Sequence, residues 1–221
     1  MTSGKEFAWS YTALNRFQNC PKQYWHLNLV KDVKDEDSEA SAEGRLIHEA
    51  LCARIVRGAQ LPIQLRHLEG LATKFLGLPG HTQGELKFAM SRDFRPVGFF
   101  ARDVFVRVVV DLLNTRGDTA IVVDWKTGRP RLDFTQLRLS AAVLAVHAPE
   151  IKTFKMAYVW TGHDKISPLT MSRDELLGVW NDLLPKVAEI ERAIGTTTFP
   201  AKQSGLCRYC PVTQCPHNPN G

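Results

Sequence analysis

The hydrophobic period changes in the middle of the chain, and this change limits the folds that the chain can adopt. Segments 85–90, 103–113 and 120–126 are short runs rich in Val, Ile and Phe, which is typical of β-strands. The last two runs are separated by NTRGD, a turn-forming sequence, so they predict a hairpin. Helical spacing comes before and after this region. The pattern therefore predicts an α/β fold in which a small mixed sheet is flanked by helices.

The flanking segments give a provisional order of elements. Ser10 is expected to cap a helix that stops at Pro21, and 31–39 is a charged segment that we interpret as a solvated loop or the approach to the next helix. A helix is predicted from Ser38 to about Val56. The remaining expectations are a weaker helix over 64–75, a loop over 76–84, a helix over 134–148, strands over 154–160 and 166–171, and a helix over 171–194 with Ser172 and Glu175 as a capping box.

Composition narrows the class of protein. The 221 residues are 44% hydrophobic and 23% charged, as in ordinary globular proteins, and the net charge of +5 favours a phosphate-bearing partner without deciding the matter. No segment approaches the roughly 20 apolar residues of a membrane helix, and the first residues lack a signal-peptide core. We therefore expect a cytoplasmic protein with no membrane association, in which cysteines serve as metal or cluster ligands rather than as disulfides.

The segment VVDWKTG, residues 122–128, carries the clearest chemical signal. Side chains alternate along a strand, so Asp124 and Lys126 share one face and Trp125 points to the other. Asp111 ends an apolar run on the neighbouring strand. Two carboxylates on adjacent strands can hold a hard cation such as Mg²⁺, and a nearby lysine can act on a water molecule. A surface ion pair between Asp124 and Lys126 is the alternative interpretation.

These residues resemble the RecB-like branch of the PD-(D/E)XK nuclease superfamily. The resemblance includes Asp111, the DWKTG sequence and Gln136 in the next helix, as well as Gly44-x-x-x-His48 in an upstream helix. Segment GELKF also matches, with Glu85 at its acidic position. Two positions differ from the usual pattern of the branch, which often has Gly at 108 and Tyr at 140, where this chain has Val and Ser.

The resemblance implies a restriction-endonuclease-like core and a role for each matching residue. Asp111 and Asp124 would bind Mg²⁺ or Mn²⁺, joined by His48 and the backbone carbonyl of Trp125. Lys126 would act on the attacking water. The catalytic set implied is Asp111, Asp124, Lys126 and Gln136. Without the resemblance, we interpret His48 as a lone histidine on an amphipathic helix, packed in or beside the core.

Three cysteines lie close together in the C-terminal tail. Cys207, Cys210 and Cys215 have the spacing of a zinc or iron–sulfur site that lacks a fourth ligand. The RFQNCPKQYW context of Cys20 resembles the early Cys-Pro element of the branch's iron–sulfur members, similar to the AddB nuclease domain and the CRISPR-adaptation exonucleases. The resemblance implies that these four cysteines hold a [4Fe–4S] cluster. Zinc is the alternative, with His217 as a spare ligand.

Several cationic and aromatic side chains are candidates for contacts with DNA. Arg129 and Arg131 follow the predicted catalytic strand, and Arg92 and Arg95 precede the second strand. These arginines either reach phosphates or are scattered solvated side chains. An aromatic group around Cys20 either packs or stacks on bases of a single strand, and it consists of Trp9, Tyr11, Phe17, Tyr24 and Trp25. Cys52 is interpreted as a core residue.

Taken together, the sequence predicts a metal-dependent DNA nuclease, acting as an exonuclease on single-stranded or end-containing DNA in recombination, repair or phage replication. We expect one nuclease domain over 1–221, with a catalytic core at 38–195 and a cysteine-cluster lobe formed by 1–37 and 196–221. A helicase or recombination protein is the expected partner type. The alternative function is a catalytically inactive iron–sulfur DNA-binding or scaffold protein on the same fold.

Overall fold

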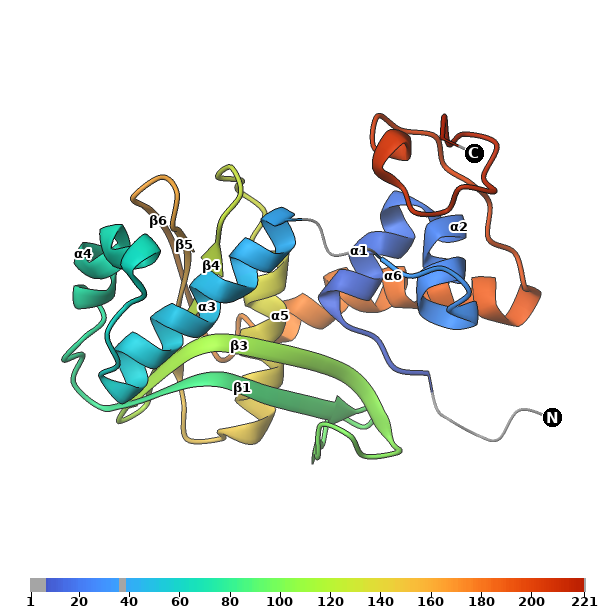
Figure 1. Ribbon diagram of the computed structural model, residues 1–221. Coiled ribbons are helices and arrows are strands. Elements are labelled where there is room, and N and C mark those ends of the chain that lie inside the picture. Colours follow the sequence, from blue (N-terminus) through green and yellow to red (C-terminus); the bar gives the residue numbers. More distant parts are fainter. Residues whose placement is uncertain (1–6, 36–38, 221) are drawn as a thin grey trace. The chain divides into compact units, whose positions relative to one another are not determined.

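A computed structural model describes residues 7–35 and 39–220 and divides the chain into two compact units, which are considered one at a time (Figure 1). The first unit comprises Met1–Ala8 and Glu39–Trp180, and the second comprises Trp9–Ser38 and Asn181–Gly221. Among the described residues, no helix combines the length and apolar character that crossing a membrane requires.

The first unit is built on a six-stranded mixed sheet in the order β2-β1-β3-β4-β5-β6. Only β4 and β5 pair in parallel, and the other neighbouring strands are antiparallel. This architecture confirms the predicted α/β fold with a small mixed sheet. The strands are β1 His81–Ser91, β2 Pro96–Val97, β3 Val104–Arg116, β4 Thr119–Lys126, β5 Thr153–Trp160 and β6 Lys165–Ser172.

Helices pack on the sheet of this unit from both sides. On one face, α3 (Glu39–Arg57) and α4 (Glu69–Thr73) form a core with sheet residues that include Leu112, Val123 and Trp125. The ring of Trp125 meets that of Phe75 edge-on at a centroid distance of 5.1 Å. On the other face lies α5 (Thr135–His147), which connects the parallel strands β4 and β5 (Figure 1).

The hairpin between β3 and β4 fixes the register that brings Asp111 and Asp124 to neighbouring positions on the two strands. Its turn is only Gly117 and Asp118, shorter than the five-residue turn predicted, because β3 runs on to Arg116. Gly117 has φ +57, a left-handed conformation that glycine adopts without a steric penalty. The pairing then runs back to Leu112 opposite Val123, one residue short of Asp111 and Asp124.

Several predicted boundaries were wrong, each for an identifiable reason. Strand β1 begins at His81, inside the predicted loop, because its first residues pair with the far end of β3. The predicted helix over 64–75 is a 3₁₀ helix, η2 (Ile63–Leu68), followed by the short α4. The capping box forms, since Ser172 donates its backbone N–H to Glu175 Oε2 at 2.6 Å, but Ser172 still belongs to β6 and the next helix begins at Leu177.

The second unit is helical and irregular. It contains α1 (Tyr11–Asn19), α2 (Pro21–Tyr24), a π-helix η1 (Trp25–Val30), most of α6 (Leu177–Thr196) and a tail with one 3₁₀ turn, η3 (Cys207–Tyr209). Ser10 caps α1 as predicted, accepting a hydrogen bond from Ala13 N. Pro21 does not end the helical path, because it opens α2 at a position where proline's missing N–H costs nothing. The predicted charged loop over 31–39 includes 36–38, which lie outside the described residues.

Candidate active site and cysteine pocket

The predicted catalytic residues meet at the end of β4. Asp111 Oδ2 accepts a hydrogen bond from the Trp125 backbone N–H at 2.9 Å, just where the β3–β4 ladder stops. A side-chain carboxylate therefore takes the place of a main-chain partner and ties Asp111 to the strand that carries Asp124. The predicted juxtaposition of these acidic residues on adjacent strands is thus present in the structure.

A hydrogen-bonded network joins the remaining predicted residues from β4 and α5. Gln136 donates from Nε2 to Asp124 Oδ1 at 2.6 Å and accepts from Lys126 Nζ at 2.9 Å. The Lys126 ammonium also lies 2.7 Å from Asp124 Oδ2. Alternation places these groups on the α5 side of β4, while Trp125 is buried on the opposite side with α3 and α4. The strand geometry predicted from VVDWKTG is confirmed.

His48 approaches the same carboxylates from α3. Its Nδ1 lies 3.3 Å from Asp111 Oδ2, and its side chain is only about one-third exposed. Burial lowers the pKa of His48, but the hydrogen bond to Asp111 and the negative charges of Asp111 and Asp124 outweigh burial and raise the pKa overall. His48 is therefore not an isolated core histidine, because its ring interacts with the carboxylates of Asp111 and Asp124.

Asp124 is the electrostatic centre of the arrangement. Burial raises the pKa of Asp124 to about 6, with the Asp111 charge acting in the same direction and Lys126 opposing both. Oδ2 of Asp124 is buried and accepts no hydrogen bond of good geometry from the described residues, although Lys126 Nζ lies close to it. A buried carboxylate that lacks full hydrogen bonding is favourable for a cation, since a cation stabilises its charged form.

The donor set at this site suits a hard divalent cation. Two carboxylates and one imidazole are oxygen and nitrogen ligands of the kind that Mg²⁺ and Mn²⁺ accept. In the residues that the structure describes, no group of three or more His, Cys, Asp and Glu side chains already has the geometry of a metal site. Asp111 and Asp124 instead use their oxygens in the hydrogen bonds and the ion pair described above.

The backbone is irregular opposite Asp111. Glu85 of β1 has φ +54, and the pairs Gly84–Leu112 and Leu86–Val110 leave Glu85 and Asp111 as a gap in the β1–β3 ladder. A non-glycine residue in the left-handed region is uncommon and tends to occur at functional sites. The side chain of Glu85 is exposed. No pattern in the sequence indicated this local conformation.

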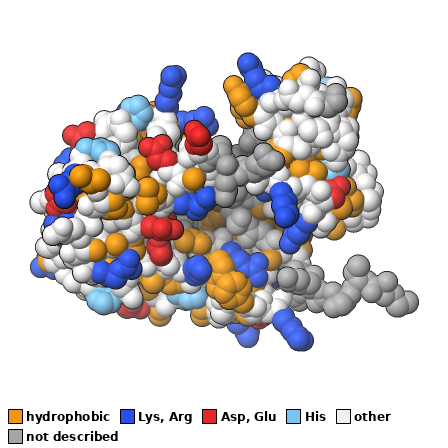
Figure 2. Space-filling view, in the orientation of Figure 1, with side chains coloured by type: hydrophobic (Ala, Val, Ile, Leu, Met, Phe, Trp, Pro, Cys, Tyr) orange, Lys and Arg blue, Asp and Glu red, His pale blue; other side chains and the backbone are white. Residues whose placement is uncertain are grey.

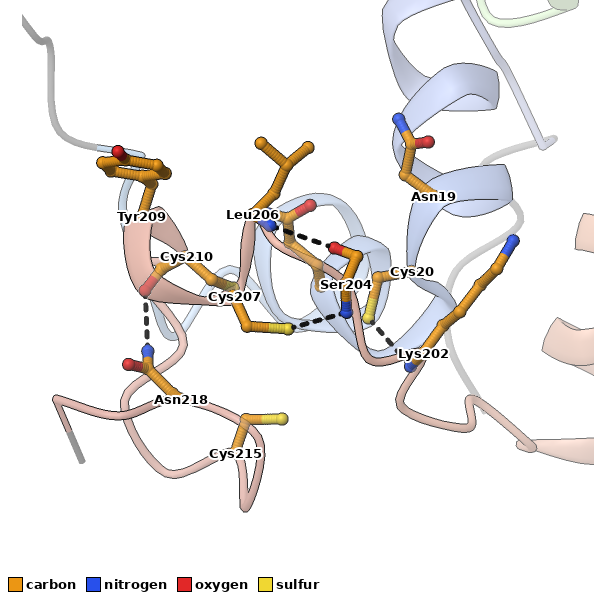
Figure 3. Close-up of a pocket in the computed structure, with 11 residues that line it drawn as sticks. Asn19, Cys20, Lys202, Ser204, Leu206, Cys207, Tyr209, Cys210, Cys215 and Asn218 are labelled. Carbon is orange, nitrogen blue, oxygen red and sulfur yellow. Dashed lines mark hydrogen bonds between the residues drawn. The ribbon is translucent and has the colours of Figure 1, made fainter.

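A second site lies in the other unit, where four cysteines line one pocket of about 230 Å³. Cys20 comes from the N-terminal helices, and Cys207, Cys210 and Cys215 come from the tail (Figure 3). The structure thus brings together the four cysteines that the sequence singled out. His217, the spare ligand proposed for zinc, is not among the residues that line the pocket. All five cysteines are free thiols, and Cys52 is buried in α3 as expected.

Local hydrogen bonds hold the cysteine pocket. Backbone N–H groups of Lys202 and Ser204 donate to the sulfurs of Cys20 and Cys207 at 3.5 and 3.3 Å (Figure 3). Burial raises the pKa of Cys210, and the other three pocket cysteines add to the increase. The four thiols are therefore close enough to influence one another electrostatically. N–H donors directed at sulfur stabilise thiolates, which are the form that binds a cluster or a metal.

One residue of this pocket was missed by sequence reasoning. Asn218 is buried, and its side-chain amide donates to the carbonyl oxygens of Cys210 and Val212 at 2.8 and 3.1 Å. These bonds close the tail on itself around Cys210. A lone asparagine among prolines resembles an ordinary turn residue, so no sequence pattern indicated this role.

The candidate DNA-contact residues lie in separate places. Arg129 and Arg131 are exposed in the loop between β4 and α5, while Arg92 and Arg95 line one cleft near the β1–β2 turn. The Arg92 guanidinium sits 4.4 Å from the Phe105 ring centroid. Among the aromatic residues near Cys20, the side chains of Trp9, Phe17 and Tyr24 are buried, which favours packing over base stacking for these three.

Comparison with known families shows which superfamily the chain belongs to. The model of the PD-(D/E)XK nuclease superfamily matches residues 8–216, nearly the whole chain. The chain belongs to the PD-(D/E)XK nuclease superfamily. A comparison with curated proteins gave no match.

Solved structures agree with the superfamily fold. The protein SSO0001 has a TM-score of 0.50 and 13% identity, with 98% of this chain and 89% of that chain covered. A candidate exonuclease from Eubacterium rectale also has a TM-score of 0.50 and 13% identity, with 93% and 87% of the two chains covered. At this level of identity the likeness shows a shared fold alone.

Proposed function

We propose that the protein is a metal-dependent DNA nuclease of the RecB-like branch, acting as an exonuclease on single-stranded or end-containing DNA. The observation that carries the proposal is the network in which Asp111, Asp124, Lys126 and Gln136 converge at the end of β4. Membership of a nuclease superfamily supports it. Recombination, repair or phage replication is the proposed context, with a helicase or recombination protein as the proposed partner type.

The residues divide into two chemical roles. Asp111, Asp124, the Trp125 backbone carbonyl and His48 would hold Mg²⁺ or Mn²⁺, which supplies positive charge where negative charge develops on the phosphate. The hydrogen bond from His48 to Asp111 orients that carboxylate. The site lies at a strand end, so a phosphodiester can approach from the loop side.

Lys126 is the group that we assign to proton transfer and charge stabilisation. Gln136 accepts a hydrogen bond from its ammonium while donating to Asp124, so one amide positions both groups. The ring of Tyr158 lies under Lys126 Nζ, with the centroid 5.2 Å away. These contacts restrict the ammonium to the neighbourhood of Asp124, where it can orient a water molecule or stabilise the charged phosphate.

We also propose that Cys20, Cys207, Cys210 and Cys215 hold a [4Fe–4S] cluster, with zinc as the alternative. The shared pocket and the N–H donors to two sulfurs support the proposal. Such a cluster would act structurally, because it would tie α1 and α2 to a tail that has little regular structure. Both units would then form one nuclease domain over 1–221, consistent with a superfamily match that spans both.

The direct test is an assay of purified protein on end-labelled single- and double-stranded DNA of each polarity, with open or blocked ends, in Mg²⁺, Mn²⁺ or EDTA. We expect cation-dependent release of nucleotides from an end, lost in Asp124→Asn. Asp118→Asn is a matched control, because Asp118 lies in the turn of the same hairpin and is exposed. Undiminished activity in Asp124→Asn would overturn the mechanism. DNA binding without hydrolysis under any of these conditions would favour the inactive scaffold instead.

A further inference from the structure

A line of side chains lies along one face of β3, between Asp111 and the β2–β3 loop. Val109 and Arg107 are two residues apart, so their side chains fall on the same face of the strand. On β1, Lys87 pairs with Val109 and Ala89 pairs with Arg107, which places Lys87 on this face as well. Each pair of residues advances about 6.8 Å along an antiparallel strand, so Arg107 lies about 14 Å along β3 from Asp111.

The opposite face of these strands is covered by α5. Phe88 packs against the ring of His147 with centroids 5.1 Å apart, and its cross-strand partner Val108 is buried. By contrast, Val109 is 45% exposed and Lys87 is exposed. The face that carries Lys87 and Val109 therefore remains accessible in this unit.

Two aromatic side chains from the β2–β3 loop join the cations on this face. Lys87 Nζ and the Arg107 guanidinium lie 5.8 and 5.7 Å from the ring centroid of Phe99. Arg107 also donates from Nε to the Phe99 carbonyl oxygen at 2.8 Å, which anchors the loop to β3. Phe100 meets Phe99 edge-on at 5.1 Å and is 83% exposed.

Isolated exposed hydrophobic residues are common on protein surfaces and need no special explanation. Phe100 differs because its ring contacts that of Phe99, which in turn lies close to two cations on the face of β3 that carries Arg107. Over the β1–β3 region, Figure 2 shows hydrophobic side chains with Lys and Arg side chains next to them. Alternation of cations and exposed aromatic rings is the pattern that binds unpaired nucleotides.

We propose that Lys87, Phe99, Phe100 and Arg107 form a binding surface for single-stranded DNA beside the strand that carries Asp111; we call these four residues the β1–β3 track. Lys87 and Arg107 contact phosphates, and Phe100 stacks on an unpaired base. A single strand is the ligand because bases within a duplex are already stacked on their neighbours. The inference rests on the proposed nuclease function and extends it by naming residues outside the catalytic network that bind the single strand.

The test measures binding of a fluorescent oligothymidylate by anisotropy in EDTA, so that binding is read without hydrolysis. We expect Phe100→Ala to weaken binding about tenfold or more, and Phe100→Tyr to restore it. Lys87→Gln should lower the slope of log affinity against log salt by about 0.7, as for one lost phosphate contact on a single strand. Matched controls are Ile63→Ala, another exposed hydrophobic residue, and Lys155→Gln, an exposed lysine on β5.

A second readout separates this inference from the proposed function. Hydrolysis of a small phosphodiester such as bis(p-nitrophenyl) phosphate does not require the track, so the track variants should retain the wild-type rate. Wild-type protein that binds as expected but hydrolyses nothing would contradict the proposed function and leave the track standing. Unchanged oligothymidylate affinity in Phe100→Ala and Lys87→Gln would overturn the track. An equal loss of affinity for blunt duplex would overturn the assignment to single strands.

Discussion

The two units of this protein place their functional residues by different means. In the first unit, which we call the sheet unit, strand register and hydrogen bonds fix the positions of Asp111, Asp124 and Lys126. A buried core lies on one side of the sheet and α5 on the other. In the second unit, which we call the cysteine unit, three of the four pocket cysteines lie in a tail whose regular structure is a single 3₁₀ turn. The residues of the sheet site are positioned by strand pairing, whereas the tail is held by local hydrogen bonds and, under the proposed function, by a ligand of its cysteines.

The largest expected effect is on catalysis, and it should be confined to the sheet unit. Lys126→Ala removes the ammonium that contacts Asp124 and Gln136, so the nuclease rate should fall by about 10²–10⁴-fold. Folding should be retained, because the Lys126 side chain is partly exposed. Steady-state nuclease rates, with circular dichroism as the check on folding, measure this. A fall of less than about threefold would remove Lys126 from the mechanism.

The next prediction concerns the cysteine unit. Cys210→Ser should abolish metal or cluster binding and speed amide hydrogen exchange over 197–220, while exchange in β3 and β4 stays as in the wild type. Mass spectrometry of hydrogen exchange measures both regions in one experiment. Cys52→Ala is the control, since Cys52 is buried in α3 and should leave exchange in the tail unchanged. If the tail of Cys210→Ser is protected from hydrogen exchange as well as that of the wild type, the tail needs no ligand.

A core substitution in the sheet unit tests whether loss of stability there leaves the cysteine unit unchanged. Phe75→Ala removes the ring that meets Trp125 edge-on, and should lower the free energy of unfolding by about 3–5 kcal/mol. Trp125 lies between Asp124 and Lys126, so activity should also fall while iron or zinc content is kept. Urea denaturation and metal analysis check the two parts. Loss of bound metal together with stability would mean that the units do not behave separately.

The smallest effect is expected at alkaline pH in the cysteine unit. Burial raises the pKa of Tyr24 to about 12, above its value in an unfolded chain. The stability contributed by the neutral phenol is therefore complete below about pH 10 and is lost as pH rises towards 12. Tyr24→Phe should weaken this alkaline loss of stability. Thermal melts from pH 8 to 11 on both proteins measure it, and parallel curves would contradict the assignment.

Much of the sheet unit could be predicted because its signals are local. The alternation in VVDWKTG places Asp124 and Lys126 on one face, and the hairpin brings Asp111 beside them. The start of β1 at His81 could not be predicted, because its strand conformation comes from pairing with distant residues of β3. The left-handed Glu85 and the contacts of Phe99 with Lys87 and Arg107 likewise depend on tertiary packing.

The grouping of the four cysteines could be predicted from the sequence, but the hydrogen bonds that support them could not. The spacing of Cys207, Cys210 and Cys215 indicates a site, and the resemblance to iron–sulfur nucleases added Cys20. No sequence pattern indicated the hydrogen bonds made by Asn218 and by the N–H groups of Lys202 and Ser204. These bonds depend on the path of an irregular part of the chain.

Binding of Mn²⁺ to the wild-type protein and to Asp124→Asn, followed by electron paramagnetic resonance of the free ion, tests the central claim most directly. If Asp111 and Asp124 share a divalent cation, the wild-type protein should take up Mn²⁺, and Asp124→Asn should bind it at least about tenfold more weakly, while Asp118→Asn binds as the wild type does. Equal affinity for Mn²⁺ in all three proteins would contradict a metal-dependent site at the end of β4.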